Sequence, residues 1–274
     1  TLILHVGNNL LKNGSFSAEI QYSFCCRESA MGTDVEKTKT ATPITVVLPD
    51  KNFEPFSDPF GSYIGKPMND EKMFLGRDAQ IRQITGMVHS YGRAITLYGQ
   101  TRTGKTSLML HLKNAIKAQY GDKALIWDMG SIAASFSQEG CQLSDFLYLM
   151  LSKGKIAVRQ NPILRQALQH PCPTNEILNH PERTLALFTD YMNDLDEVMQ
   201  ANHMILVLFI DEFSYLHGYI KQGKLSENFM HFWKALLQNH CIFAIIAGQD
   251  DMPEFLREYP NDFACMELMK ITYL

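Results

Sequence analysis

The sequence lacks the signatures of several large protein classes. No two of its six cysteines are separated by the two-residue gap of a zinc knuckle or redox motif, so we expect free thiols in a reducing cytosol. Basic residues are not in excess: 25 Lys and Arg stand against 29 Asp and Glu, a formal net charge of −4. No apolar run approaches the roughly 20 residues of a membrane-spanning helix. We therefore expect a cytoplasmic protein without a membrane segment. Nucleic-acid binding would need a local basic patch, and none is evident.

What is present is the balance of an ordinary globular chain. Hydrophobic residues make up 46% and charged residues 20% of the 274 residues, which is enough for one main core and an appendage. The first residue is Thr1 rather than Met, and no basic region followed by a long apolar stretch marks a signal peptide. We therefore expect a segment cut from a longer protein.

Changes in composition predict three regions along the chain. Residues 1–50 contain short β-like stretches, and the alternation of apolar and polar residues from Phe16 to Phe24 predicts a strand with one buried face. Residues 51–73 contain prolines and glycines that exclude a continuous helix, so we expect a linker there. Residues 74–274 are expected to form the main core.

The main core is predicted to be an α/β domain. Strands without alternation, typical of a sheet buried on both faces, are expected at its centre, and helices between them imply parallel strands. A proline-punctuated insertion is expected at 162–173. The predicted strands cover 94–98, 124–128, 204–210 and 242–247, and the predicted helices cover 77–87, 104–118, 143–151 and 183–199. The fold class is thus a three-layer sandwich around a parallel central sheet, preceded by a small β-rich segment.

A phosphate-binding motif stands between the first of these strands and the following helix. Residues 99–106 fit the P-loop, or Walker A, pattern G-x-x-x-x-G-K-[ST]. Its glycines let the backbone wrap around phosphates, Lys105 supplies a positive charge, and the Thr106 hydroxyl can reach Mg²⁺. Arg102 is either a phosphate ligand, a contact to a neighbouring subunit or a solvated loop residue, and Ser107 either contacts the α-phosphate or lies in the first helical turn. The predicted nucleotide-binding residues here are Gly99, Gln100, Thr101, Arg102, Thr103, Gly104, Lys105, Thr106 and Ser107.

Acidic and amide side chains follow two of the apolar strands. Asp211 and Glu212 end the run 204–210 in the manner of a Walker B motif, where Asp211 would hold Mg²⁺ through its water shell and Glu212 would activate the attacking water. Gln249 follows the strand 242–247 and can report on the γ-phosphate. The predicted catalytic residues are therefore Lys105, Asp211, Glu212 and Gln249, with ATP and Mg²⁺ as the bound groups.

The segment Phe74-Leu75-Gly76-Arg77, together with 97–107, resembles the F-x-G-R and P-loop signatures of the STAND class, signal-transduction ATPases related to AAA+ and archaeal ATPases. The resemblance covers about residues 58–274. It implies that Gly76 and Arg77 lie beside the adenine. No guanine-reading N-K-x-D motif occurs, which also favours ATP.

The resemblance further implies an ATP-dependent switch that self-associates through the ATPase core, with sensor and effector domains outside this segment, in some members in bacterial defence against phage. The core would then end just before a winged-helix lid. No arginine finger is evident in the insertion between Asp128 and Met204, where Arg159, Arg165 and Arg183 are the candidates. Alternatives left open are a DNA-associated ATPase of the Orc-like or loader kind, a nucleotide-binding module without turnover and a small-molecule kinase.

Overall fold

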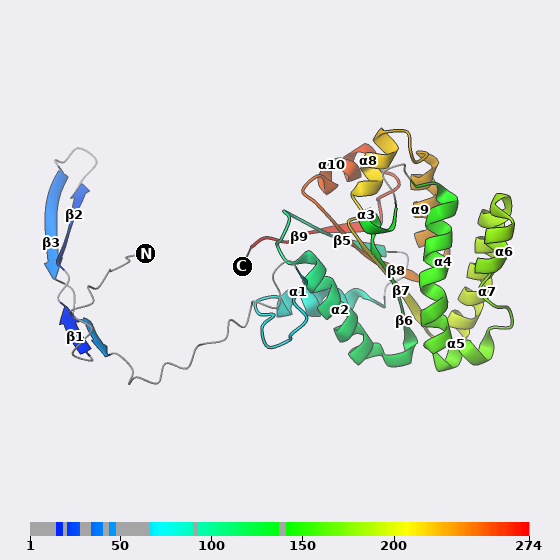
Figure 1. Ribbon diagram of the computed structural model, residues 1–274, viewed down its shortest axis with the longest axis horizontal. Helices are drawn as coiled ribbons and strands as arrows, with labels where there is room; N and C mark the ends of the chain where they lie inside the picture. Colours follow the sequence, from blue (N-terminus) through cyan, green and yellow to red (C-terminus); the bar gives the residue numbers. More distant parts are fainter. Residues whose placement is uncertain are drawn as a thin grey trace. The chain divides into compact units, whose positions relative to one another are not determined.

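The chain divides into two units, Thr1–Ser62 and Tyr63–Leu274. The computed structural model describes the backbone of four strands in the first unit, and residues 66–89, 93–136 and 141–273 in the second (Figure 1). In the first unit, β1 (Ser15–Ala18) pairs antiparallel with β4 (Ile44–Val47), and β2 (Gln21–Arg27) pairs antiparallel with β3 (Asp34–Thr40). The single strand predicted from Phe16 onwards thus falls on two strands with different partners. The β-like stretch expected at residues 2–6 lies outside the described residues.

The second unit is built on a five-stranded sheet in which every pairing is parallel, with the order β6-β7-β8-β5-β9. The strands are β5 (Arg93–Tyr98), β6 (Ala124–Ser131), β7 (Ile205–Asp211), β8 (Ile242–Gly248) and β9 (Met266–Lys270). β7 and β8 are buried along almost their whole length, which matches their uninterrupted apolar sequences. The predicted α/β fold with a parallel central sheet is therefore confirmed.

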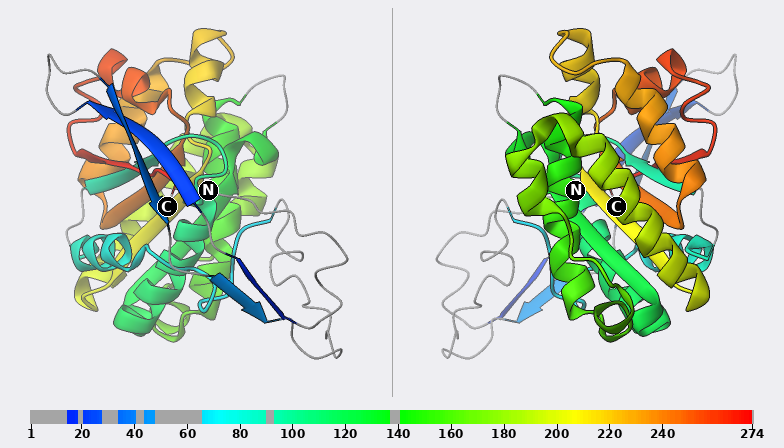
Figure 2. Two further views of the ribbon diagram at one scale, coloured as in Figure 1. Left: turned by 90° about the vertical axis from the view of Figure 1, so that its left-hand side faces the viewer. Right: turned by 90° about the vertical axis from the view of Figure 1, so that its right-hand side faces the viewer.

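Helices cover both faces of this sheet, as Figures 1 and 2 show. Alternate residues of β7 enter two separate cores: Val207 and Phe209 pack with α1 and α2, and Leu206 and Leu208 pack with α4, α7 and α9. The right-hand view of Figure 2 looks onto the layer that contains α4 and α7. The helices are α1 (Asp78–Met87), α2 (Lys105–Tyr120), α3 (Ile132–Ser135), α4 (Leu143–Gln160), α5 (Pro162–Ala167), α6 (Thr174–Asn179), α7 (Thr184–Ala201), α8 (Tyr215–Lys221), α9 (Asn228–Asn239) and α10 (Met252–Glu258), with short 3-10 turns η3 (Gly121–Lys123) and η4 (Pro181–Arg183). No helix of the described residues is long and apolar enough to cross a membrane.

α4 runs to Gln160 rather than ending near residue 151 as the sequence suggests. Gly154 lies inside the helix, beyond the predicted end. A Cβ built on Gly154 would lie 2.3 Å from Cε2 of Trp127 in β6. The glycine therefore lets α4 approach the sheet closely rather than ending the helix. The insertion 162–173 also contains the short helix α5, which Asn161 caps by accepting hydrogen bonds from the N–H groups of Ile163 and Leu164.

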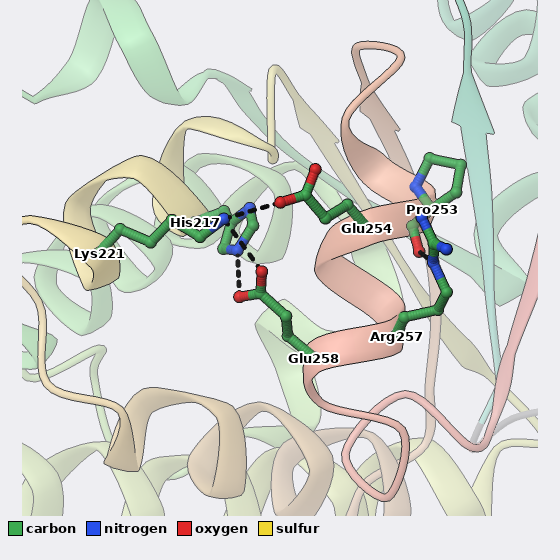
Figure 3. Close-up of polar contacts among 6 residues, drawn as sticks. All are labelled: His217, Lys221, Pro253, Glu254, Arg257 and Glu258. Atoms are coloured by element: carbon green, nitrogen blue, oxygen red, sulfur yellow. Dashed lines mark hydrogen bonds and ion pairs between the residues drawn. The ribbon is translucent and has the colours of Figure 1, made fainter.

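A polar cluster ties α8 to α10, the helices that follow β7 and β8 (Figure 3). Nε2 of the buried His217 lies 2.7 Å from Oε2 of Glu258, and the His217 ring stacks on Phe255 with centroids 4.4 Å apart. Lys221 Nζ lies 3.0 Å from a carboxylate oxygen of both Glu254 and Glu258. The hydrogen bond from His217, reinforced by Lys221, holds the pKa of Glu258 below its ordinary value. We call this cluster the α8–α10 clasp.

Candidate functional site

The P-loop lies between β5 and α2 with its tip exposed to solvent. Gln100, Thr101 and Arg102 are exposed, and α2 begins directly after Gly104, which has a left-handed backbone at φ +88°. Arg102 also has positive φ, at +65°. The free N–H groups at the start of α2 therefore face the loop interior and solvent, as an anion site requires. With this loop in the sheet described above, the fold is the predicted P-loop NTPase sandwich.

Lys105 lies folded against its own loop. Its Nζ donates hydrogen bonds to the backbone carbonyls of Gly99 at 2.7 Å and Gln100 at 2.6 Å. Partial burial lowers the pKa of the Lys105 ammonium, while the carboxylates of Asp211, Asp250 and Glu212 act in the opposite direction. Desolvation of the ammonium group therefore outweighs the attraction of these carboxylates, and an added anion would favour its charged form.

Thr106 and Asp211 join the P-loop to the carboxyl end of β7. The Thr106 hydroxyl donates a hydrogen bond of 2.7 Å to Oδ2 of Asp211, and Oδ1 of Asp211 accepts the N–H of Glu212 at 2.8 Å. A hydroxyl and a carboxylate are the hard oxygen ligands that Mg²⁺ takes in proteins. No group of three or more His, Cys, Asp or Glu side chains able to hold a metal exists among the described residues. The pair therefore fits Mg²⁺ that completes its shell with water and phosphate oxygens, rather than an all-protein metal site.

Glu212 is held by Ser131, a residue that the sequence did not single out. Glu212 has a left-handed backbone at φ +56°, and its Oε2 accepts a hydrogen bond from the Ser131 hydroxyl. Ser131 ends β6, the neighbour of β7, and its Oγ also accepts the N–H of Ala134 at 3.0 Å. A polar residue at the end of the adjacent strand is the signal that could have identified it. The β6–β7 register shifts between Asp128 and Ser131, and this irregularity hides the position in the sequence.

We expect Ser131→Ala to lower ATP turnover about fivefold to tenfold while changing KM less than twofold. The hydroxyl orients the Glu212 carboxylate, and a hydrogen bond to a charged group contributes about 1.5–3 kcal/mol, of which only the orienting part affects the reaction. Steady-state phosphate release measures both parameters. Ser131→Thr, which keeps the hydroxyl, should restore most of the turnover. A turnover unchanged by Ser131→Ala would show that Ser131 does not position Glu212.

Gln249 follows β8 at the same edge of the sheet. Because the strand order places β8 between β5 and β7, Gln249 stands between the P-loop and the Asp211–Glu212 pair. Its backbone N–H donates to Oγ of Ser214 at 3.3 Å, and Phe213 N–H donates to the carbonyl of Ala247 at 2.7 Å, so the two strand ends are bonded to each other. Asp250, the next residue, is exposed, and its carboxylate raises the pKa of Lys105.

Arg77 reaches the P-loop from the start of α1. Its side chain is buried, and Nη2 donates to the backbone carbonyl of Thr103 at 3.3 Å and to that of Thr272. Gly76 beside it is exposed and has positive φ, at +77°. Arg77 therefore links three segments that are distant in the sequence, since it donates to backbone carbonyls on the P-loop and after β9.

The segment after β9 lies along the P-loop as well. Ile271 N–H donates to the Tyr98 carbonyl at 2.7 Å, and the Tyr273 hydroxyl donates to the Thr101 carbonyl at 3.0 Å. A Cβ on Gly99 would lie only 2.2 Å from the carbonyl oxygen of Ile271, and Gly99 has φ +151°. The first P-loop glycine thus serves two needs, the turn of the loop and the close approach of residues 271–273.

Ser107 lies in the first turn of α2 and is buried. Its Oγ accepts the N–H of Met68 at 2.9 Å, while the Met68 carbonyl lies 3.1 Å from Nε2 of His111. The His111 ring stacks on Phe74 with centroids 4.0 Å apart. Ser107 thus lies in the first helical turn, and its contact to the α-phosphate stays a prediction. The described part of the predicted linker, from residue 66 on, contacts the core here.

We expect Arg77→Gln to weaken ATP binding about tenfold and to lower the free energy of unfolding by about 2–4 kcal/mol. The substitution leaves the Thr103 and Thr272 carbonyls without their cationic donor in a buried place. Thermal unfolding and titration with a fluorescent ATP analogue measure the two effects. Arg82→Gln, which removes an exposed arginine from the same helix, should leave both within error. Equal effects of the two variants would contradict a linking role for Arg77.

No protein-family model matches this sequence, and no curated protein sequence matches it. Solved structures do match. The ORC2 protein of Aeropyrum pernix, in ADPNP and ADP complexes, matches with a TM-score of 0.48 and 14% identity over 72% of this chain and 48% of that chain. A Walker-type ATPase of Pyrococcus abyssi matches with a TM-score of 0.48 and 16% identity over 75% and 56%. AMPPCP-bound DnaA of Aquifex aeolicus matches with a TM-score of 0.35 and 15% identity over 79% and 51%. The chain thus spans about half the length of the structures it matches.

Proposed function

We propose that this chain binds ATP with Mg²⁺ at the sheet edge formed by the P-loop and the carboxyl ends of β7 and β8, and that it hydrolyses ATP. The observation that carries the proposal is the hydrogen bond between Thr106 and Asp211, which brings the start of α2 to the end of β7. It places a cationic phosphate-binding loop beside two carboxylates. This combination suits a polyphosphate with a bridging Mg²⁺.

Each side chain then has a defined task. Backbone N–H groups of the P-loop and the positive end of α2 bind the phosphates, and Lys105 leaves its loop carbonyls to bind the β- and γ-phosphate oxygens. Thr106 and Asp211 would hold Mg²⁺, Asp211 through water; when bound, the ion neutralises charge on the β- and γ-phosphates. Glu212 accepts a proton from the water that attacks the γ-phosphorus. The bond from that phosphorus to the β–γ bridging oxygen breaks, and ADP and phosphate leave.

The position of Gln249 supports a role in the same step. It stands at the end of the strand that separates the P-loop strand from the Glu212 strand, and Ser214 fixes its backbone. From there its side-chain amide can hydrogen-bond the γ-phosphate or the attacking water and lose that partner after hydrolysis. The proposed preference for adenine over guanine rests on the resemblance of the Phe74–Arg77 segment to the STAND class and on the missing N-K-x-D motif.

We propose further that the ATPase acts as a slow regulated switch of the STAND type. The support is Arg77, which belongs to the F-x-G-R segment and bonds both to the P-loop and to residue 272 after β9. A change of the P-loop on binding nucleotide is therefore passed to the chain that follows the sheet. Measured turnover below about 1 per second together with a nucleotide-dependent oligomeric state would support the switch. A rate increase on adding DNA at low salt would instead favour a DNA-associated ATPase.

Removal of Mg²⁺ tests the proposed reaction. We expect EDTA to reduce phosphate release from ATP by at least about 100-fold, because the charge on the phosphates is then no longer neutralised by the ion that Thr106 and Asp211 hold. Added Mg²⁺ should restore the rate. An equal rate in EDTA would contradict the Mg²⁺ site, and ATP recovered intact after long incubation with Mg²⁺ would reduce the chain to a nucleotide-binding module.

A further inference from the structure

A hollow of about 330 Å³ lies between the end of α4, α5 and α7, away from the P-loop. Its lining includes Lys155, Val158 and Arg159 of α4, Leu164 and Arg165 of α5, and Tyr191 of α7. We call it the α4–α5 hollow. Its volume lies at the lower end of the range of small-molecule pockets, which is about 300–1,000 Å³.

The α4–α5 hollow is at the opposite end of the sheet from the nucleotide site. α4 has 18 residues, so it spans about 27 Å from its start near the end of β6. At its other end, Asn161 Nδ2 donates to the Asp122 carbonyl at 2.8 Å, and Asp122 lies just before β6 begins. Figure 1 shows α5 at the end of the unit opposite α3 and α8. Arg159 and Arg165 are therefore too far from the P-loop of their own chain to act on its nucleotide.

The charge around the hollow has one sign. Lys155, Arg159 and Arg165 line it, and no carboxylate of the described residues does. Neither arginine forms an ion pair within that part of the chain, and Lys155 Nζ donates to a neutral acceptor, Oγ1 of Thr174, at 2.9 Å. His170 also lines the hollow but has its own carboxylate partner, Asp194. Within the described residues, three cations without a carboxylate partner therefore line one hollow in a chain of net charge −4, and an anion bound there would be attracted by all three.

The floor of the hollow is apolar. Its accessible apolar surface comes from the half-buried Leu168 and the exposed Pro171, which lie over the buried Val158, Leu164 and Tyr191. A bare inorganic anion would leave this surface against water, whereas an aromatic or aliphatic body would cover it. The cations at the rim suit an anionic group and the apolar floor suits an apolar body, so the hollow suits a ligand that has both.

We propose that the α4–α5 hollow binds a small organic anion, a phosphate or carboxylate on an aromatic or aliphatic body, whose charge is met by Lys155, Arg159 and Arg165. A ligand bound there contacts α4, α5 and α7, three helices that lie between β6 and β7 in the chain. The site is separate from the proposed ATP site and does not depend on ATP hydrolysis.

Phenyl phosphate is a suitable probe, because it has both parts and no nucleobase. It is titrated into the 274-residue chain by isothermal calorimetry, with inorganic phosphate and phenol as probes that each carry one part. We expect phenyl phosphate to bind at least fivefold more tightly than either. Arg159→Gln/Arg165→Gln should weaken it at least tenfold, while Lys153→Gln/Arg183→Gln, which removes two exposed cations that do not line the hollow, should change it less than twofold.

Three results would overturn the proposal. Equal affinity in wild type and the double arginine variant would place the probe elsewhere. Loss of binding in Lys105→Ala would place it in the P-loop. Binding of a hexaglutamate peptide through the two arginines without binding of phenyl phosphate would make the surface a docking site for acidic protein. Protection of Cys172, a half-buried thiol of the hollow, from alkylation by the bound probe is an independent supporting measurement.

Discussion

Lys105→Ala is expected to weaken ATP binding at least about 100-fold and to abolish measurable hydrolysis. The ammonium group donates to two carbonyls of the P-loop, those of Gly99 and Gln100, and in the proposed function it is the point charge for the β- and γ-phosphates. Titration of a fluorescent ATP analogue and phosphate release measure the two losses. Lys117→Ala, on the exposed side of the same helix, should leave both unchanged.

The same substitution should leave the stability of the nucleotide-free chain almost unchanged. Burial lowers the pKa of Lys105, which means that the folded state disfavours the charged form at neutral pH. The substitution removes the desolvation penalty of the ammonium group, which stabilises the folded state. It also removes two hydrogen bonds to carbonyls, which destabilises it, so the two effects oppose each other. We expect a melting temperature within about 4 °C of wild type. ATP binding that survives in Lys105→Ala would refute the assignment of this loop as the phosphate site.

Glu212→Gln should reduce ATP hydrolysis about 100-fold to 10,000-fold while ATP affinity stays within about twofold. Loss of a general base costs this much because the amide cannot accept the proton of the attacking water. The amide keeps an oxygen that can still accept the hydrogen bond from Ser131, so the local backbone should persist. Single-turnover hydrolysis and equilibrium binding separate the two quantities.

Glu176→Gln, an exposed carboxylate on α6, is the matched control and should behave as wild type. If Glu212→Gln hydrolyses ATP at the normal rate, Glu212 is not the base, and the exposed Asp250 becomes the first alternative. If affinity and rate fall together, Glu212 serves binding rather than the chemical step.

The sequence predicted those parts of the fold that depend on local pattern. β7 and β8 were predicted to within one residue at each end, because strands buried on both faces are uninterrupted apolar runs. β9 was missed, because an edge strand with Glu267 and Lys270 and a half-exposed Leu268 carries no such run. The second half of α4 was missed because the reason for Gly154 is a tryptophan on another element.

The residues of the candidate site likewise include some that the sequence could identify and some that it could not. The P-loop residues and the Asp211–Glu212 pair are contiguous motifs, so sequence alone could single them out, and the structure brings Thr106 and Asp211 together. Ser131, and the link from Arg77 to Thr272, depend on contacts between segments far apart in the chain. Arg77 was singled out by its F-x-G-R segment, but its bond to Thr272 could not be predicted, and Ser131 is marked only by its place at the end of the strand next to β7.

The α8–α10 clasp has a mechanical consequence for the proposed ATPase. α8 follows the strand that ends at Asp211, α10 follows the strand that precedes Gln249, and the clasp joins the two helices. A partner that displaced α10 would therefore also act on α8, and through it on the strand end next to Glu212, the proposed base. Such a partner would act on the proposed hydrolysis without contacting the nucleotide.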